Sequence, residues 1–310
     1  MSKPPEAATL RPWEARERDD EDAIAGVYHE THHDYPIARR WNDDFFEFVA
    51  ATYGSGERVL DLGSGPGSLW EHWRRLPNVG RLVGCDISER MVEEAQRRFP
   101  DGEFVVGRVH AIPFEDSSFD LVIASSVLHH VPDVELPSAF AEIKRVLAPY
   151  GHVVGREPLS SYAVGASQSW TSGAMMNFRH LVYRLTRTRD PEMPELGSHH
   201  HVPEVKTFIE ALSQHLKPLE VQTRFPFSPI VMRVQSERIA EVALLLDEKL
   251  RHRAGTMFYY AAVRDYATAE DVARCVDLAL ADDAEDQTEF LAYLQAAAQE
   301  IEKVLQRDGG

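Results

Sequence analysis

The stretch that decides the fold lies at residues 59–67 and reads VLDLGSGPG. The apolar run 59–62 contains one acid, Asp61, and is followed by glycine at three alternate positions, 63, 65 and 67. Glycine tolerates positive φ and has no Cβ, so this pattern favours a sharp turn where a ligand comes close to the backbone. The helix that follows such a turn presents free backbone N–H groups. We therefore interpret this stretch as a strand, a ligand-binding turn and the approach to a helix.

The spacing of the glycines separates this turn from two better-known phosphate-binding loops. The dinucleotide fingerprint G-x-G-x-x-G needs a third glycine at the position of Ser68, and no Gly-Lys-Ser/Thr follows as in a P-loop. Asp61 would repel a pyrophosphate but suits a ligand that carries an ammonium group. Asp86 ends the next apolar run, 19 residues beyond Gly67, where an acid can accept hydrogen bonds from both ribose hydroxyls. Together these features favour an adenosine ligand with an ammonium group.

Regular alternation of short apolar runs and amphipathic stretches continues after the glycine turn. Alternation of this kind indicates βαβ units, a parallel sheet and right-handed crossovers. After a long irregular connection we expect two closing strands, for seven in total, and a ligand site at the carboxyl ends of the strands. We predict strands at 58–62, 81–86, 103–107, 119–125, 152–156, 219–225 and 257–264, and helices at 68–75, 89–99, 136–147, 203–216 and 237–251.

The flanking segments differ from this core in composition. Residues 1–20 are rich in Pro, Glu and Arg, which is typical of a mobile tail, and two helices that break at Pro36 are expected from 22 to about 53. Residues 266–310 hold 11 acidic and 3 basic residues, which indicates an acidic helical tail that either docks on the core or dimerises. We therefore divide the chain into a disordered start and helical lid (1–53), a core (54–265) with a substrate or lid insertion at about 158–201, and the tail (266–310).

Overall composition narrows the class of partner. The chain has 310 residues, of which 33 are basic and 50 acidic, for a net charge of −17. Such a charge argues against a nucleic acid or an anionic membrane as partner. No apolar run approaches the ~20 residues of a membrane span, and the first residues lack the apolar region of a secretory signal. With only two cysteines, these features favour a cytoplasmic protein, and a homodimer formed through the acidic tail is an alternative to a docked tail.

Four stretches in order resemble the class I S-adenosylmethionine-dependent methyltransferases, and within them the small-molecule subgroup. They read VLDLGSGPG at 59–67, GCDISERMVEEA at 84–95, IPFEDSSFDLVIASSVLHHVPD at 112–133 and EIKRVLAPYGHVV at 142–154. The resemblance implies a Rossmann-like methyltransferase fold, an α/β doubly wound, mostly parallel seven-stranded sheet. It also implies S-adenosylmethionine as the cofactor.

The resemblance assigns cofactor-binding roles along the ends of the strands. The methionine ammonium and carboxylate are expected at Asp61 and Gly63, the ribose at Asp86, and the adenine between Ile87 and Met91. The full expected set is Asp61, Gly63, Ser64, Gly65, Asp86, Ile87, Met91, Arg108, Val109 and Ser125. Arg108 departs from the family, which usually has an acid here. Arginine has no acceptor for the adenine amino group, so we expect Arg108 to point away and pair with an acid while the N–H of Val109 meets the ring.

Catalytic and acceptor-binding candidates surround this set. His129 and His130 follow the fourth strand and are candidates for a general base, although either can serve as a hydrogen-bonded structural residue. Tyr28, His32 and Tyr35 on the first helices, and Trp170 and Met175 in the long insertion, are candidates for binding the acceptor. Residues 199–201 are three consecutive histidines, which cannot all face one ion in a regular element, so we predict no metal site.

The resemblance therefore implies methyl transfer from S-adenosylmethionine to oxygen, nitrogen or carbon of a small organic acceptor, as in natural-product or secondary metabolism. A protein of the same fold that binds the cofactor but catalyses another reaction, such as a cyclisation, or only regulates a partner, would share every binding motif. The third hypothesis, a nicotinamide-dependent oxidoreductase, is disfavoured by the glycine spacing.

Overall fold

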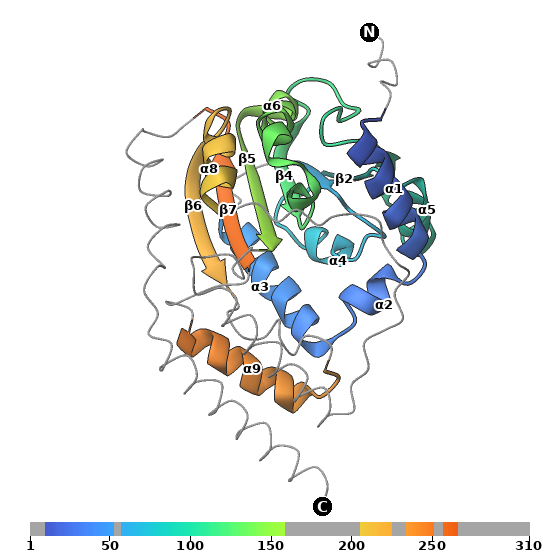
Figure 1. The fold of residues 1–310 in the computed structure, drawn as a ribbon, viewed down its shortest axis with the longest axis vertical. Helices are drawn as coiled ribbons and strands as arrows, with labels where there is room; N and C mark the ends of the chain where they lie inside the picture. The colour runs from blue at the N-terminus through green and yellow to red at the C-terminus, as the bar shows by residue number, and fades with distance from the viewer. Residues whose placement is uncertain (1–9, 53–56, 159–204, 225–233, 251–256, 266–310) are drawn as a thin grey trace, which may run out of the picture.

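A seven-stranded sheet forms the centre of the described protein (Figure 1). The computed structural model describes residues 10–52, 57–158, 205–224, 234–250 and 257–265. Within them the strand order is β3-β2-β1-β4-β5-β7-β6, which confirms the predicted seven strands. The strands are β1 (Arg58–Leu62), β2 (Arg81–Asp86), β3 (Glu103–Val106), β4 (Phe119–Ser125), β5 (Leu147–Pro158), β6 (Lys217–Arg224) and β7 (Met257–Val263).

The order of the strands creates a switch point beside β1. The first five strands in the chain run parallel, and β7 pairs antiparallel with β5 and β6. From β1 the chain moves outward through β2 to β3 and then returns to β4 on the other side of β1. The carboxyl ends of β1, β2 and β4 therefore meet at one edge, which is where open α/β sheets bind their ligands.

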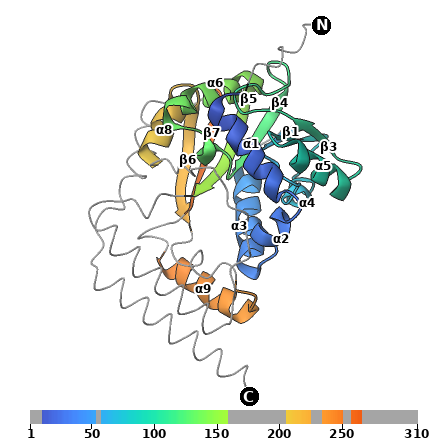
Figure 2. The same cartoon turned by 45° about the vertical axis from the view of Figure 1, so that its right-hand side comes forward.

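Helices cover both faces of the sheet, as Figures 1 and 2 show from two directions. One face is packed by α3, α4, α5 and α9, and the other by α6 and α8. The short helix α2 precedes α3, and α1 lies beside α5 in both views. The helices are α1 (Pro12–Ile24), α2 (Tyr28–His32), α3 (Pro36–Thr52), α4 (Trp70–Trp73), α5 (Glu89–Arg98), α6 (Leu136–Val146), α8 (Val205–Ser213) and α9 (Glu237–Leu250).

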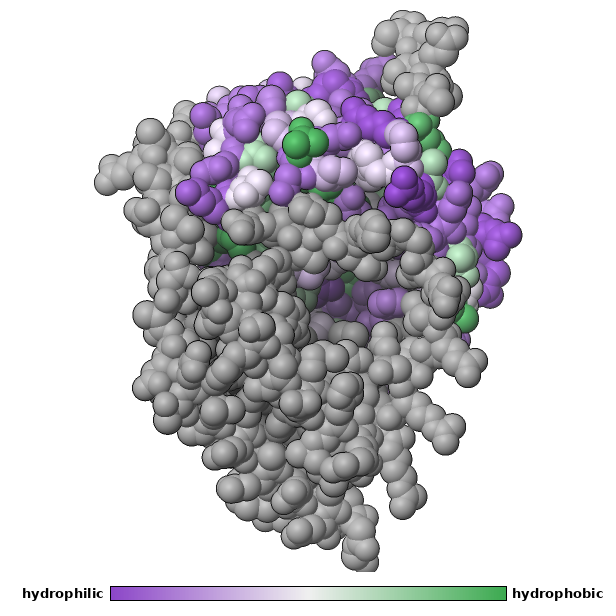
Figure 3. Space-filling model, viewed as in Figure 1, coloured by the Kyte–Doolittle hydropathy of each residue, from purple (hydrophilic) through white to green (hydrophobic). Residues whose placement is uncertain are grey.

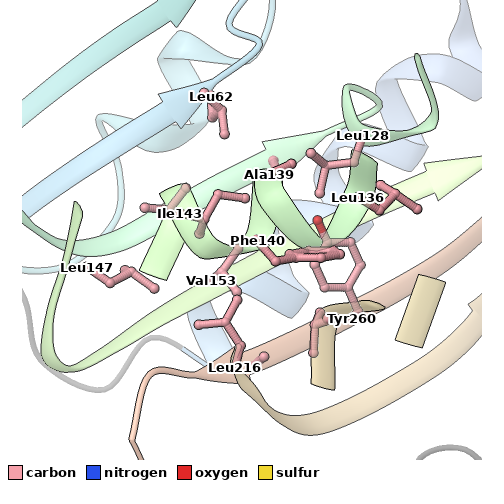
Figure 4. Close-up of a cluster of buried hydrophobic side chains, with 14 of the residues drawn as sticks. Leu62, Leu128, Leu136, Ala139, Phe140, Ile143, Leu147, Val153, Leu216 and Tyr260 are labelled. Carbon is pink, nitrogen blue, oxygen red and sulfur yellow. The ribbon is translucent and has the colours of Figure 1, made fainter. Parts of the chain in front are cut away.

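The core under α6 and α8 takes one set of alternate apolar residues of the parallel strands, and the apolar residues between them pack on the other face of the sheet. Leu60 and Leu62 of β1 point to this face, and Phe140 of α6 packs edge-on to Phe208 of α8 with ring centroids 5.2 Å apart. Figure 4 shows Phe140, Ile143 and the sheet residues Val153 and Tyr260 in one cluster. Because these side chains are fully buried, their burial anchors the sheet edge that carries the site.

The N-terminal segment differs from the prediction of a mobile tail over residues 1–20. Helix α1 begins at Pro12, whose missing N–H costs nothing in the first helical turn. The Glu14 carboxylate accepts a hydrogen bond from the backbone N–H of Arg11 at 2.8 Å. Glu14 is fully buried and Glu17 is 9% exposed. This acidic segment therefore has a buried helix face, which its composition does not indicate. The predicted break at Pro36 is confirmed as the start of α3.

Strand β5 is longer than the predicted 152–156 because it contains an irregularity. Leu147 pairs with Phe119 while His152 pairs with Leu121, so extra residues of β5 are left unpaired between the two positions. Tyr150 lies there with φ of +62°. Such a bulge breaks the alternation that marks a strand in a sequence.

The described residues visible in Figure 3 are mostly hydrophilic, with small separate hydrophobic spots. In the part of the chain that the structure describes, no helix combines the length and apolarity of a membrane span.

Candidate functional site

A pocket opens at the switch point of the sheet and is lined by eight of the residues expected from the sequence. The glycine turn, the ends of β2 and β4, the segment after β3 and helices α1 and α2 all contribute to its wall. The predicted members that line it are Gly63, Gly65, Asp86, Ile87, Val109, Ser125, Tyr28 and His130. The edge of the sheet that the topology marks for a ligand is thus where these side chains meet.

The glycine turn after β1 has the backbone that only glycine adopts readily. Gly63, Gly65 and Gly67 all have positive φ, between 51° and 71°. A Cβ on Gly63 would lie 2.6 Å from the side chain of Val127, so close packing as well as the backbone requires glycine there. A Cβ on Gly65 would meet only Tyr28, at 4.0 Å. The backbone of Gly65 therefore faces the open pocket, as the close approach of a ligand requires.

Asp86 is the acid that the turn holds in place. Its carboxylate accepts hydrogen bonds from the backbone N–H of Gly65 at 2.8 Å and of Ser88 at 2.9 Å. Burial raises the pKa of Asp86 to about 6, while the two N–H groups act in the opposite direction. The group is 8% exposed and lines the pocket, so its remaining lone pairs can accept hydrogen bonds from the hydroxyls of a sugar.

Asp61 lies deeper than the sequence suggested. It is 2% exposed and is not among the residues that line the pocket. Burial raises its pKa from 3.8 to about 7, with the Trp73 indole lowering it and Asp86 raising it. The buried Asp61 carboxyl therefore favours its protonated form more strongly than an exposed aspartate does.

Asparagine at position 61 is expected to reduce the pH dependence of stability. Because the pKa of Asp61 is raised by folding, its contribution is fully present below about pH 3.8 and is lost as the pH rises through about 7. Asp61→Asn stays neutral, so its free energy of unfolding relative to wild type should increase by about 1.4 kcal/mol for each pH unit between about pH 4 and pH 7. Urea unfolding at several pH values measures this difference, and parallel pH profiles for the two proteins would contradict it.

Arg108 pairs with an acid, as its departure from the family pattern led us to expect. Its Nη1 donates to Glu14 Oε2 of α1 at 3.1 Å, and Arg108 is not among the pocket-lining residues. Val109, the next residue, does line the pocket. The side chain of Arg108 therefore anchors α1, while the backbone at Val109 stays beside the ligand space.

Helix α1 brings to the pocket four residues that the sequence analysis missed. Trp13, Glu14, Glu17 and Glu21 all line it, and a nitrogen of His130 lies 3.0 Å from Glu17 Oε1. The three acids are spaced three and four residues apart, which places them on one face of a helix. The spacing of these acids could have indicated a common helix face in the sequence. The charged composition of the segment instead suggested a mobile tail.

The two candidate histidines lie in different surroundings. His130 lines the pocket, whereas His129 is buried and its Nδ1 lies 2.8 Å from Oε2 of Glu157. The same carboxylate also accepts hydrogen bonds from the backbone N–H groups of Val127, Leu128 and His129. His129 and Glu157 therefore hold the loop after β4, and only His130 faces the ligand space.

Comparison with known proteins agrees with this geometry. Residues 60–155 match the family model of the methyltransferase domain. They carry the glycine turn, Asp86 and the loop after β4. Residues 60–155 are a methyltransferase domain.

Relatives of this methyltransferase domain act on varied acceptors. The chain is 36% identical over 104 residues to a malonyl-[acyl-carrier protein] O-methyltransferase of Erwinia billingiae, covering 34% of this chain and 40% of the relative. It is 36% identical over 115 residues to a demethylmenaquinone methyltransferase of Thermotoga maritima, covering 37% and 48%. The match thus spans less than half the length of either relative.

The likeness of fold extends beyond the methyltransferase domain. A geranyl diphosphate C-methyltransferase of Streptomyces coelicolor, solved with Mg²⁺, geranyl diphosphate and S-adenosyl-L-homocysteine, superposes with a TM-score of 0.55 at 15% identity. The superposition covers 83% of this chain and all of that protein. At this identity the likeness shows the fold, and the observed sheet has the predicted Rossmann-like methyltransferase architecture.

The remaining predicted residues surround the pocket or lie outside the described chain. His32 stacks on Tyr28 with ring centroids 4.4 Å apart, and Ser125 accepts a hydrogen bond from Arg156 at 2.9 Å. The others lie away from the pocket wall. Ser64, Tyr35 and Met91 are buried behind it, and Trp170, Met175, the insertion and the acidic tail lie outside the described residues.

Proposed function

We propose that this protein binds S-adenosylmethionine in the pocket at the switch point and transfers its methyl group to a small organic acceptor. The observation that carries the proposal is the pairing of Gly65 with Asp86. A backbone that faces open space and a buried, doubly held carboxylate lie within hydrogen-bonding distance of each other. This arrangement suits a ligand with a ribose, and the matching family model supports the cofactor's identity.

Different residues of the pocket would bind different parts of this cofactor. Asp86 would hold the ribose, Gly63 and Gly65 the methionine portion, and Ile87 and Val109 the adenine. When bound, the cofactor supplies an electrophilic methyl group. The protein's own contribution is to align an acceptor, exclude water and remove a proton, and alignment alone can lower a barrier by ~7–11 kcal/mol. Two groups in the pocket can accept that proton. One is the pair of His130 and Glu17, and the other is Glu21.

Other properties predicted from the sequence stay predictions. These are the cytoplasmic location, the absence of a nucleic-acid partner, homodimer formation, a role in secondary metabolism, and the acceptor-binding roles of Tyr28, His32, Tyr35, Trp170 and Met175.

Two measurements test the proposed function. Calorimetry should show one S-adenosylmethionine bound per chain, with S-adenosyl-L-homocysteine (SAH) competing for the same site. When the protein is incubated with S-adenosylmethionine labelled in its methyl group and with cell extract from the producing organism, a labelled small molecule should form. Absence of cofactor binding would refute the proposal. Binding with conversion of a molecule that takes up no label would favour the alternative of another reaction on this fold.

Alanine at position 65 is expected to weaken SAH binding by about tenfold or more. The new Cβ would project into the pocket without colliding with the protein, since Tyr28 at 4.0 Å is its nearest neighbour. The cost to the fold is the strain of positive φ, about 1–2 kcal/mol. Calorimetry measures the affinity and chemical denaturation the stability.

Gly80→Ala is the matched control for Gly65→Ala. Its Cβ would make ordinary contacts of 3.5 Å and longer, at the start of β2 and away from the pocket. SAH affinity should stay within about twofold in this variant. Equal affinity in Gly65→Ala and wild type would show that the ligand does not approach this backbone.

A further inference from the structure

The pocket carries more negative charge than its own cations balance. Glu14, Glu17, Glu21 and Asp86 line it, and among the described residues no lysine or arginine does. Glu14 pairs with Arg108, and Glu17 with His130. Glu21 makes no hydrogen bond or ion pair with any described residue, and the charges that act on it are those of other acids. Glu21 therefore has neither a counter-charge nor a hydrogen-bond donor in the described wall, whereas Asp86 is held by two backbone N–H groups.

Two observations show that these acids are unsatisfied without a cationic ligand. Burial, and next to it the charges of Asp86 and Glu17, raise the pKa of Glu21 well above its usual range. Independently, Oε1 of the fully buried Glu14 accepts no hydrogen bond from the described protein, and the nearest nitrogen of His110 lies 3.5 Å away. Buried carboxylates without partners are costly, so a positive group in the pocket would be held strongly.

The spacing of the acids suits a small cationic group. Single oxygens of Glu17 and Glu21 and a nitrogen of His130 all lie within 4.8 Å of one another. A nitrogen that donates two hydrogen bonds of about 2.9 Å at a tetrahedral angle holds its acceptors about 4.7 Å apart. A protonated amine can therefore bridge the two carboxylates. Tyr28 lines the same space, and aromatic rings attract cations.

We propose that the methyl acceptor is an amine, whose protonated nitrogen is received by Glu17 and Glu21 beside the ring of Tyr28. This inference rests on the proposed function. The proposed cofactor contacts are made by Asp86 and the glycine turn, and none of them involves Glu21. A carboxylate or phosphate acceptor would face the four acids of this wall, and a neutral hydroxyl would leave Glu21 without a counter-charge.

The same residues account for the proton that amine methylation releases. The amine R–NH₃⁺ gives one proton to Glu21, and its freed lone pair forms the N–C bond as the S–C bond breaks with its electron pair on sulfur. The products are R–NH₂⁺–CH₃, SAH and the proton, which passes from Glu21 to solvent. Charge and atoms balance without any further reactant.

A matched set of small probes tests the proposal on the full chain saturated with SAH. The set is 2-phenylethylamine, 2-phenylethanol and phenylacetate, which share an aromatic ring and differ mainly in charge. The amine should bind at least about tenfold more tightly than the other two, as expected for hydrogen bonds between charged groups. Glu21→Gln should abolish this preference while SAH affinity stays within about twofold. Calorimetry or ligand-observed NMR provides the affinities.

Asp19→Asn is the matched control, because Asp19 is exposed on the same helix and does not line the pocket. It should keep the amine preference. The proposal is overturned if 2-phenylethanol or phenylacetate binds as well as the amine, if the amine does not bind at about 10 mM, or if the preference survives in Glu21→Gln. Binding of Mg²⁺ or Zn²⁺ that Glu21→Gln removes would overturn it in favour of a metal site. Failure of SAH itself to bind would instead refute the proposed function.

Discussion

Alanine in place of Glu157 is expected to lower the free energy of unfolding by about 3–5 kcal/mol. Glu157 of β5 is fully buried, and its two oxygens accept from three backbone N–H groups and contact His129 Nδ1 at 2.8 Å. The truncation leaves these groups in an apolar interior without a partner. A buried donor that loses its acceptor costs ~1–3 kcal/mol, and several do so together here.

The same substitution should disturb ligand binding, because Glu157 holds the loop after β4. That loop starts at Ser126, which has φ of +57°, and it carries Val127 against the glycine turn. We expect weaker SAH binding in any folded fraction of Glu157→Ala.

Two variants make the stability result specific to Glu157. Glu157→Gln keeps the shape and one acceptor oxygen, so it should lose less than half of what Glu157→Ala loses. Glu93→Ala removes an exposed carboxylate on α5 and should change stability by at most ~0.5 kcal/mol. Guanidinium unfolding provides the three values. A loss below about 1 kcal/mol in Glu157→Ala would show that the loop finds other partners.

The strands could be predicted closely from the sequence because each is a short apolar run with a polar boundary. The predicted bounds 58–62, 81–86 and 119–125 coincide with β1, β2 and β4. The bounds of helices were harder to predict where few residues determine the ends of the helix. The predicted helix at 68–75 is reduced to the four residues of α4, since turns of the chain on both sides replace regular helix.

Contacts between distant parts of the chain account for what the sequence did not reveal. Glu14 is buried because Arg108, 94 residues away, pairs with it, and composition alone cannot show such a partner. His129 and His130 are neighbours in a single 3₁₀ turn, yet one faces Glu157 and the other faces Glu17. Their order in the chain contains no information about which one enters the pocket.

The cofactor residues were predictable to the extent that backbone geometry dictates them. Gly63, Gly65 and Asp86 follow from the turn and the strand end, and all three line the pocket. Asp61 and Ser64 belong to the same motif but are buried and do not line the pocket, whereas Leu62, next to Asp61 in β1, does. A motif therefore identifies the site more reliably than it identifies which members touch the ligand.

Alanine in place of Asp86 is expected to weaken S-adenosylmethionine and SAH binding by about 2–3 kcal/mol, or about 30-fold to 150-fold. The carboxylate is held by the N–H groups of Gly65 and Ser88, so it is oriented before the ligand arrives. Both ribose hydroxyls would donate to it, and each such bond to a charged acceptor contributes separately. Because burial raises the pKa of Asp86 to about 6, wild-type affinity should fall as the pH drops through that value.

The ribose contact is isolated by a comparison of SAH with its 2′-deoxy analogue. In wild type the missing hydroxyl should weaken binding by about tenfold. In Asp86→Ala the two ligands should bind equally, because the acceptor of that hydroxyl is gone. Circular dichroism verifies that the variant is folded, and calorimetry gives the four affinities. If a folded Asp86→Ala still prefers SAH over the deoxy analogue by tenfold, another residue holds the ribose and the assignment of Asp86 is wrong.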